Sequence, residues 1–177
     1  MSYAINQETE FETAQTIITA SATSISLSQI LPHYDGANFE NATTLYRKPS
    51  YQRALRKSNE WCIKLIESII KGYTTGSITM SEWTTIQIVN DSPVPYTYFN
   101  IEDGQTRLDA YQRFRNGDFT TRYGNYEDVS QKFDNYQHSV IMLRKVNALI
   151  SDKDYFKALQ ENFSLLQEGT PLSTSDR

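Results

Sequence analysis

The residues best suited to chemistry lie where an extended segment gives way to a helical one, at Asp103 and Gly104. The first amides of a helix have no carbonyl partner within it, and together with the helix dipole they attract anions. Asp103 suits the N-cap because its carboxylate can accept bonds from those amides, and Gly104 permits a sharp turn and the close approach of a ligand. Arg107, one turn further on, adds a planar guanidinium that suits phosphate oxygens. The pattern predicts an anion-binding turn, with a capped helix and a solvated arginine as the alternative.

Two strands and a helix must position this turn. Residues 94–102 alternate in the two-residue period of a half-buried strand. Residues 77–90 predict a second strand, and the turn-forming run from Asn90 to Pro93 indicates that the two strands pair antiparallel. The apolar spacing after the turn predicts a helix that stops at Asn116 and Gly117.

A further helix is predicted from Ser58 or Asn59, either of which can cap it, to Gly72. Its apolar face should belong to the core and consists of Trp61, Leu65, Ile66, Ile69 and Ile70. Cys62 in the same pattern predicts a buried thiol, and as the only cysteine it excludes an internal disulfide.

The other segments complete an α+β class. Their patterns favour β structure over residues 16–31 with an interruption near residues 20–24, a long loop over 118–136, a strand over 137–146 and a helix over 152–168.

The segment from Tyr46 to Lys57 concentrates positive charge without any acid. Its cations are Arg47, Lys48, Arg53, Arg56 and Lys57. A solvated loop explains such a run, because short charge runs are common on surfaces. Clustered cations with aromatic neighbours can also hold phosphates and stack on bases.

Three blocks of the sequence resemble one known family. The run DGQTR at residues 103–107 resembles the DGQQR motif of the family found at the N-terminus of GmrSD-type modification-dependent restriction enzymes, with Thr106 in place of the second glutamine. The run PSYQR at residues 49–53, before the tryptophan-containing helix, resembles the family's YQR element. The run from Phe163 to Ser173 is similar to a third block, with Gln167 where asparagine is usual.

The resemblance implies a ParB/sulfiredoxin-like fold, a mixed sheet with flanking helices, that binds a nucleoside triphosphate at the strand-to-helix turn. The nucleotide-binding residues would be Gln52, Arg53, Gly104, Gln105, Thr106 and Arg107, and the catalytic ones Asp103, Gln105 and Arg107. The acids near the turn are Glu102, Asp103 and Asp109; adjacent Glu102 and Asp103 should point to opposite sides of the strand. Of these acids only Asp103 is placed well by the cap argument, and it is the expected Mg²⁺ ligand.

Composition sets the domain organisation. The 177 residues suit one domain, and their formal charge of −4 gives no general basic surface. We divide them into an acidic segment, residues 1–45, packed on a family domain, residues 46–177, that is either minimal or truncated at its C-terminus.

The sequence has neither a P-loop nor a GxGxxG fingerprint, and neither a membrane span nor a signal peptide is predicted. The expected location is the cytoplasm, or the host-cell cytoplasm if the gene is viral.

Three functions fit these observations. The first is a domain of restriction or anti-phage type that binds a nucleoside triphosphate, either with or without hydrolysing it. The second is a ParB-like module that binds or cleaves DNA through the same basic segment, alone or with a separate nuclease subunit. The third is a catalytically silent interaction protein that retains the fold. His33 and His138, the only histidines, lack cysteine neighbours, so the sequence does not indicate a zinc site.

Overall fold

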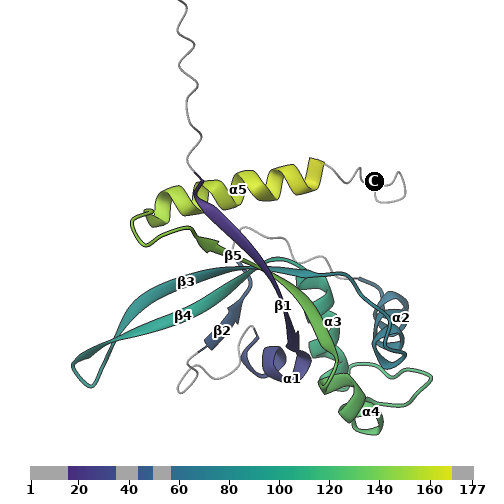
Figure 1. The fold of residues 1–177 in the computed structure, drawn as a ribbon. Coiled ribbons are helices and arrows are strands. Elements are labelled where there is room, and N and C mark those ends of the chain that lie inside the picture. Colours follow the sequence, from purple (N-terminus) through teal and green to yellow (C-terminus); the bar gives the residue numbers. More distant parts are fainter. Residues whose placement is uncertain (1–15, 35–43, 50–56, 169–177) are drawn as a thin grey trace, which may run out of the picture.

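The computed structural model describes residues 16–34, 44–49 and 57–168. Within them the elements follow in the order β1 (Ile18–Ser26), α1 (Leu27–Ile30), the 3₁₀ helix η1 (Leu31–His33), β2 (Thr44–Arg47), α2 (Asn59–Ile70), β3 (Ile78–Val89), β4 (Ser92–Asp103), α3 (Gln105–Arg115), α4 (Tyr126–Asp134), β5 (Gln137–Lys145) and α5 (Asp152–Glu168) (Figure 1).

Five strands form one mixed sheet in the order β1-β5-β3-β4-β2. β3 pairs antiparallel with β4, and β1 pairs antiparallel with β5. β5 runs parallel to β3, and β2 runs parallel to β4. A mixed sheet with helices on both sides confirms the predicted α+β class.

The N-terminal part of the described chain belongs to the sheet and its core. β1 pairs continuously along β5, from Ile18 opposite Lys145 to Ser26 opposite Gln137. The predicted interruption near residues 20–24 is therefore wrong, because unbroken pairing holds these small residues extended. The apolar residues that follow were expected to be β structure, but Leu27 and Ile30 lie in a helical turn and are fully buried.

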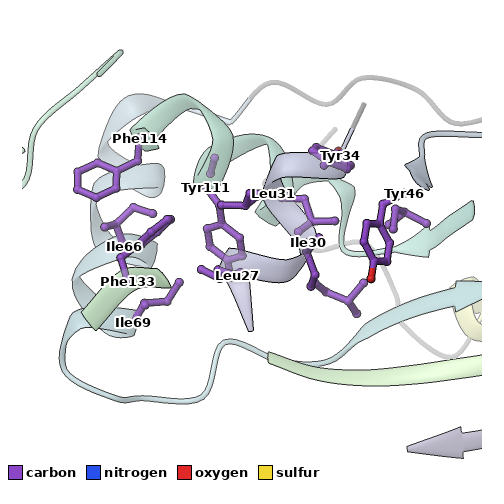
Figure 2. Packing of buried hydrophobic residues seen from close by; sticks show 14 of the residues in the cluster. Leu27, Ile30, Leu31, Tyr34, Tyr46, Ile66, Ile69, Tyr111, Phe114 and Phe133 are labelled. Atoms are coloured by element: carbon purple, nitrogen blue, oxygen red, sulfur yellow. The ribbon is translucent and has the colours of Figure 1, made fainter. Parts of the chain in front are cut away.

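The main core lies between one face of the sheet and helices α1 to α4 (Figure 1). Figure 2 shows the aromatic centre of this core, where the rings of Tyr111 and Phe114 from α3 meet Phe133 from α4. Cys62 is buried as predicted, whereas Trp61 is only partly buried at the edge of the cluster. α3 places its predicted apolar residues inward and ends, as expected, at Asn116 before Gly117 with φ 81°.

The opposite face of the sheet is covered by α5 (Figure 1). Tyr155 and Leu159 of this helix pack with Leu143 and Ile150, and the Tyr155 ring lies 4.9 Å from that of Trp83. In the described part of the chain, none of the helices has the length and apolar character needed to span a membrane. The cytoplasmic location stays a prediction.

α4 replaces part of the long loop predicted over residues 118–136. The Asn125 side chain accepts a hydrogen bond from the Asp128 amide, and the Asp128 side chain accepts one from the Asn125 amide, which forms a capping box. Phe133 is fully buried at the other end of the helix. The loop prediction is therefore wrong for residues 126–134. The segment looked like a loop because it is rich in tyrosine, asparagine and aspartate, although two of these residues form the helix cap.

The hairpin of β3 and β4 extends well past its neighbours (Figure 1). Each strand has 12 residues, and both turn residues, Asn90 and Asp91, have positive φ, as in the turns that match strand twist. β5 pairs only with Ile78–Ser81 of β3, and β2 pairs only with residues 97–100 of β4. Beyond these pairings the hairpin is a two-stranded arm.

Candidate functional site

The parallel pairing of β2 with β4 defines the position of the site. Arg47 ends β2 opposite Asn100, three residues before β4 itself ends. Parallel strands deliver the segments that follow them to the same end of a sheet. The start of the basic segment and the DGQTR turn therefore lie at one end of the sheet, where ligands commonly bind in α/β architectures.

Lys48, just after β2, directly contacts α3, the helix that follows the turn. Its Nζ lies 2.7 Å from Asp109 Oδ1 on α3, and Tyr34 donates from its hydroxyl to the same oxygen at 2.9 Å. The Lys48 ammonium also lies 5.3 Å from the centre of the Tyr34 ring. Sequence reasoning named Asp109 as an available acid but missed this cluster, because Tyr34 lies 75 positions away.

Gly104, not Asp103, is the N-cap of α3. Asp103 is the last residue of β4, and Gly104 follows with φ 99° in the left-handed region. The predicted cap is therefore wrong, because the chain turns one residue later than expected. A Cβ at Gly104 would lie 2.9 Å from Ile78 Cγ1, so glycine permits both the turn and the close approach to β3.

Arg107 is held by backbone rather than free in solvent. Its Nη1 donates to the Thr75 carbonyl at 2.7 Å, and its Nη2 donates to the Ser77 carbonyl at 2.6 Å. Nη2 also donates to Asp103 Oδ2 at 3.0 Å. The side chain is only 17% exposed, which excludes the solvated arginine of the alternative interpretation. Arg107 therefore fastens the α2–β3 loop to the turn.

The two acids at the end of β4 point in opposite directions, as predicted. Asp103 has a side chain that is 64% exposed, and its pairing with Arg107 partly neutralises its charge. Glu102 is buried and accepts a hydrogen bond from Ser81 Oγ at 2.5 Å. The Trp83 indole donates to the same Ser81 oxygen at 2.9 Å. Of the two acids, Asp103 is thus the one exposed at the turn.

Gln105 and Thr106 follow with different exposure. Gln105 is buried, and its Nε2 donates to the Ile101 carbonyl at 3.1 Å, so its amide braces the turn against β4. Thr106 is half-buried on the first turn of α3. The structure thus brings together Asp103, Gly104, Gln105, Thr106 and Arg107. Gln52 and Arg53 lie outside the described residues, and their part in the site stays a prediction.

A buried polar network supports the loop that Arg107 holds. Thr75 Oγ1 lies 3.1 Å from the Tyr111 hydroxyl, 3.2 Å from the Tyr136 hydroxyl and 3.2 Å from His138 Nε2. His138 Nδ1 faces the Ser139 carbonyl at 3.2 Å; since a carbonyl only accepts, Nδ1 carries the proton and Nε2 accepts. Burial lowers the pKa of His138 to about 4 and raises the pKa of Tyr111. A neutral, hydrogen-bonded histidine thus lies behind the site.

The donor set at the turn fits one kind of metal binding. Among the described residues there is no group of three or more histidine, cysteine or acidic side chains that could hold a metal ion by themselves. Magnesium is often held by one or two carboxylates together with substrate phosphates and water. Asp103, exposed beside the first amides of α3, fits a Mg²⁺ ion that arrives with a nucleotide.

Comparison with known families gives one match. The model of the family described as GmrSD restriction endonuclease, N-terminal domain, matches residues 36–176. No curated protein and no solved structure matches the chain. The finer likeness to the ParB and sulfiredoxin fold therefore stays a prediction within the α+β class.

Proposed function

The chain belongs to the GmrSD restriction endonuclease N-terminal domain family, and on this basis we propose that it binds a nucleoside triphosphate at the turn between β4 and α3 in a restriction-type role. The observation that carries the proposal is the parallel pairing of β2 with β4. It brings the DGQTR turn and the start of the basic segment to the same end of the sheet.

The phosphates would lie against the start of α3. The amides of Gln105 and Thr106 are the first in the helix, so they have no carbonyl within it to bond. The positive end of the helix dipole lies at the same place. Gly104, with φ 99°, lets the chain turn into the helix while it packs closely against β3, where a Cβ would lie 2.9 Å from Ile78 Cγ1. A phosphate at this position would be held chiefly by backbone donors, which fits the sequence lacking a P-loop.

Arg107 has two parts in this proposal. Three hydrogen bonds hold its guanidinium against the α2–β3 loop and Asp103, which fixes its position before any ligand binds. An arginine has five N–H donors, so donors remain for a phosphate oxygen. Pre-positioned charge of this kind loses little conformational entropy on binding.

Asp103 would hold the magnesium ion that accompanies the nucleotide. Its carboxylate lies beside the phosphate position, where without a metal it would repel an anion. When bound, Mg²⁺ neutralises phosphate charge and, in hydrolysis, polarises the phosphoryl group. Binding should therefore depend on Mg²⁺ through Asp103.

The test is a thermal-shift panel of nucleoside triphosphates with and without Mg²⁺. A ligand at about 100 times its dissociation constant should stabilise the fold by roughly 2.7 kcal/mol. We expect Asp103→Asn to lose the Mg²⁺-dependent part of the shift, whereas Glu60→Gln, at an exposed acid on α2, should keep it. If no triphosphate stabilises the wild-type chain, the proposal is wrong.

Thr106 decides whether hydrolysis accompanies binding. It stands where the resembled motif has its second glutamine. We therefore expect the wild-type chain to bind a nucleoside triphosphate but to hydrolyse it slowly. Thr106→Gln restores the DGQQR sequence on a half-exposed position of the first helical turn. We expect this variant to release phosphate faster than wild type with similar binding. Equal and negligible hydrolysis by both chains, with intact binding, would leave a nucleotide-binding domain without hydrolysis.

A further inference from the structure

Thr75 contacts α3 through both its backbone and its side chain. Its carbonyl accepts a hydrogen bond from Arg107 Nη1 at 2.7 Å, and its Oγ1 lies 3.1 Å from the Tyr111 hydroxyl. Arg107 and Tyr111 are four positions apart, so they lie on the same side of the helix, one turn from each other. Thr75 therefore connects two environments. Its carbonyl faces the guanidinium at the site, whereas its hydroxyl reaches a tyrosine that is fully buried in the main core.

Two further side chains, from the start of β5 and the residue before it, complete the surroundings of the Thr75 hydroxyl. The Tyr136 hydroxyl and His138 Nε2 each lie 3.2 Å from Thr75 Oγ1. His138 Nε2 also lies 3.2 Å from the Tyr111 hydroxyl, and the histidine is fully buried. The Thr75 side chain is thus surrounded by polar groups from α3 and from the β5 end of the sheet, whose positions the main core fixes.

The directions of these hydrogen bonds follow from the groups that can only accept. The Tyr136 hydroxyl donates to the Tyr73 carbonyl at 3.0 Å, so toward Thr75 its oxygen accepts. His138 Nε2 also accepts, because Nδ1 carries the proton. These two acceptors must therefore share the hydroxyl protons of Thr75 and Tyr111. Removing the Thr75 hydroxyl leaves one acceptor without a donor, which costs free energy and disturbs the group.

The loop that carries the Thr75 carbonyl needs such support. Residues 73–77 belong to no helix or strand, and Gly76, which is exposed and has φ 84°, follows Thr75 directly. Glycine has more backbone freedom than any other residue, so the peptide between Thr75 and Gly76 would rotate easily if nothing held it. The side-chain contacts of Thr75 belong to the same residue as the carbonyl. They are therefore well placed to fix the direction in which this carbonyl points.

We propose that Thr75 is a positioning residue for Arg107. The contacts of the Thr75 hydroxyl with Tyr111 and His138 hold its carbonyl in the direction that the guanidinium requires. The consequence for affinity rests on the proposed binding of a nucleoside triphosphate at the turn. A guanidinium that is fixed before the ligand arrives loses less conformational entropy when it binds a phosphate. The Thr75 hydroxyl thus raises phosphate affinity through Arg107.

The first test needs no ligand and follows the guanidinium by nitrogen NMR of the full chain. Because both Nη atoms donate hydrogen bonds, rotation about the Cζ–Nη bonds should be slow, and Arg107 should give separate Nη signals that Arg107→Lys removes. Thr75→Val keeps the shape of the side chain without its hydroxyl and should merge these signals. Thr75→Ser keeps the hydroxyl and should leave them separate. Thr74→Val, at the exposed neighbouring residue, is the matched control and should match wild type.

The second test measures the affinity of the same chains for inorganic triphosphate with Mg²⁺, by calorimetry. Thr75→Val should weaken binding about tenfold, which corresponds to the loss of about one hydrogen bond to a charged group. Thr75→Ser should bind like wild type. In a chain that already carries Arg107→Lys, adding Thr75→Val should have no further effect, because lysine lacks the planar fork that bonds both carbonyls.

Two results would overturn the inference. One is a set of Arg107 signals that Thr75→Val leaves unchanged. The other is an equal loss of triphosphate affinity on Thr75→Val with and without Arg107→Lys, since the hydroxyl would then act without the arginine. If circular dichroism shows that Thr75→Val does not fold, Tyr111→Phe replaces it with the same expectations, because it removes a hydroxyl from the same group and keeps the ring. A wild-type chain that binds no triphosphate contradicts the proposed function, whereas the NMR result still decides whether Thr75 positions Arg107.

Discussion

Arg107 and Gly76 are in such close contact that a Cβ added to the glycine would overlap Arg107 Nη1. The guanidinium lies against this bare backbone while it bonds the carbonyls on either side, those of Thr75 and Ser77. The arginine of the DGQTR motif therefore needs a glycine 31 positions earlier in the chain. The turn before α3 and the loop before β3 therefore form one unit.

Gly76→Ala should destabilise the protein more than Gly72→Ala. Both glycines have positive φ, at 84° and 76°, so both substitutions carry a left-handed penalty of about 1 to 2 kcal/mol. Only Gly76 has a neighbour within reach of the new Cβ, and displacing Arg107 should raise its cost to about 3 kcal/mol. Urea unfolding of the two variants measures the difference. Equal costs would show that the guanidinium can move aside freely.

Arg107→Ala should lower stability as well as nucleotide binding. A solvated arginine could be removed at little cost to the fold, but the Arg107 side chain holds two carbonyls and is mostly buried. Losing hydrogen bonds to a charged group should cost about 2 to 4 kcal/mol in urea unfolding. Lys64→Ala, at an exposed ion pair on α2, is the control and should cost less than about 0.5 kcal/mol. Because of this loss, Asp103→Asn is the cleaner variant for binding.

His138 should make the folded state less stable in mild acid. Burial lowers its pKa from 6.5 to about 4, so between these values the unfolded chain binds a proton that the folded chain does not. The contribution of neutral His138 to the free energy of unfolding is complete above about pH 6.5. It falls as the pH decreases toward 4, by about 3 kcal/mol in all. Urea unfolding at pH 7.5, 6 and 5 measures this loss.

The control for the pH series is His138→Gln, which cannot titrate. The variant should be less stable than wild type at pH 7.5, because it disturbs the bonds to Thr75 and Tyr111, but it should lose less stability on acidification. Carboxylates titrate in both proteins, so only the difference between the two slopes reports on His138. Parallel pH profiles would mean that the buried ring does not resist protonation.

Phe114→Ala should cost more than Trp61→Ala, although the sequence indicated the tryptophan as core. Phe114 is fully buried and contacts Phe133 at 5.3 Å between ring centres, so its loss should cost about 3 to 5 kcal/mol. Trp61 packs only against the edge of the cluster, which should reduce its cost to about half of that range. Chemical denaturation ranks the two. A larger cost at Trp61 would place the centre of the core on α2.

Periodicity explains which elements could be predicted. α2, α3 and α5 carry regular apolar spacing, and β3 and β4 alternate about an evident turn, so each appears close to its expected bounds. α1 and α4 are short and offer few apolar positions, so composition concealed them. For α4 the signal was local, the capping box of Asn125 and Asp128.

The site was predictable in its residue types but not in its contacts. The turn at Gly104 and the opposed carboxylates of Glu102 and Asp103 follow from local geometry. The partners of Arg107 do not, because the Thr75 and Ser77 carbonyls are backbone groups that leave no mark in a sequence. Asp109 was recognised as an acid without its partners Lys48 and Tyr34 for a different reason: both side chains come from segments far earlier in the chain, Tyr34 75 positions away.

The last prediction separates a nucleotide from duplex DNA as the principal ligand. Duplex binding needs many cations over a broad surface, and log affinity then falls with log salt with a slope of about −0.9 for each phosphate neutralised. The ion pairs of the described chain consume several cations, including Lys48 with Asp109 and Arg107 with Asp103. A triphosphate needs only the amides at the start of α3 and a few charges. We therefore expect a nucleotide-induced thermal shift, and weak or no binding to an unmodified duplex at physiological salt. Titration of duplex binding against salt checks this, and tight binding with a steep slope, together with no nucleotide shift, would establish the DNA-binding function instead.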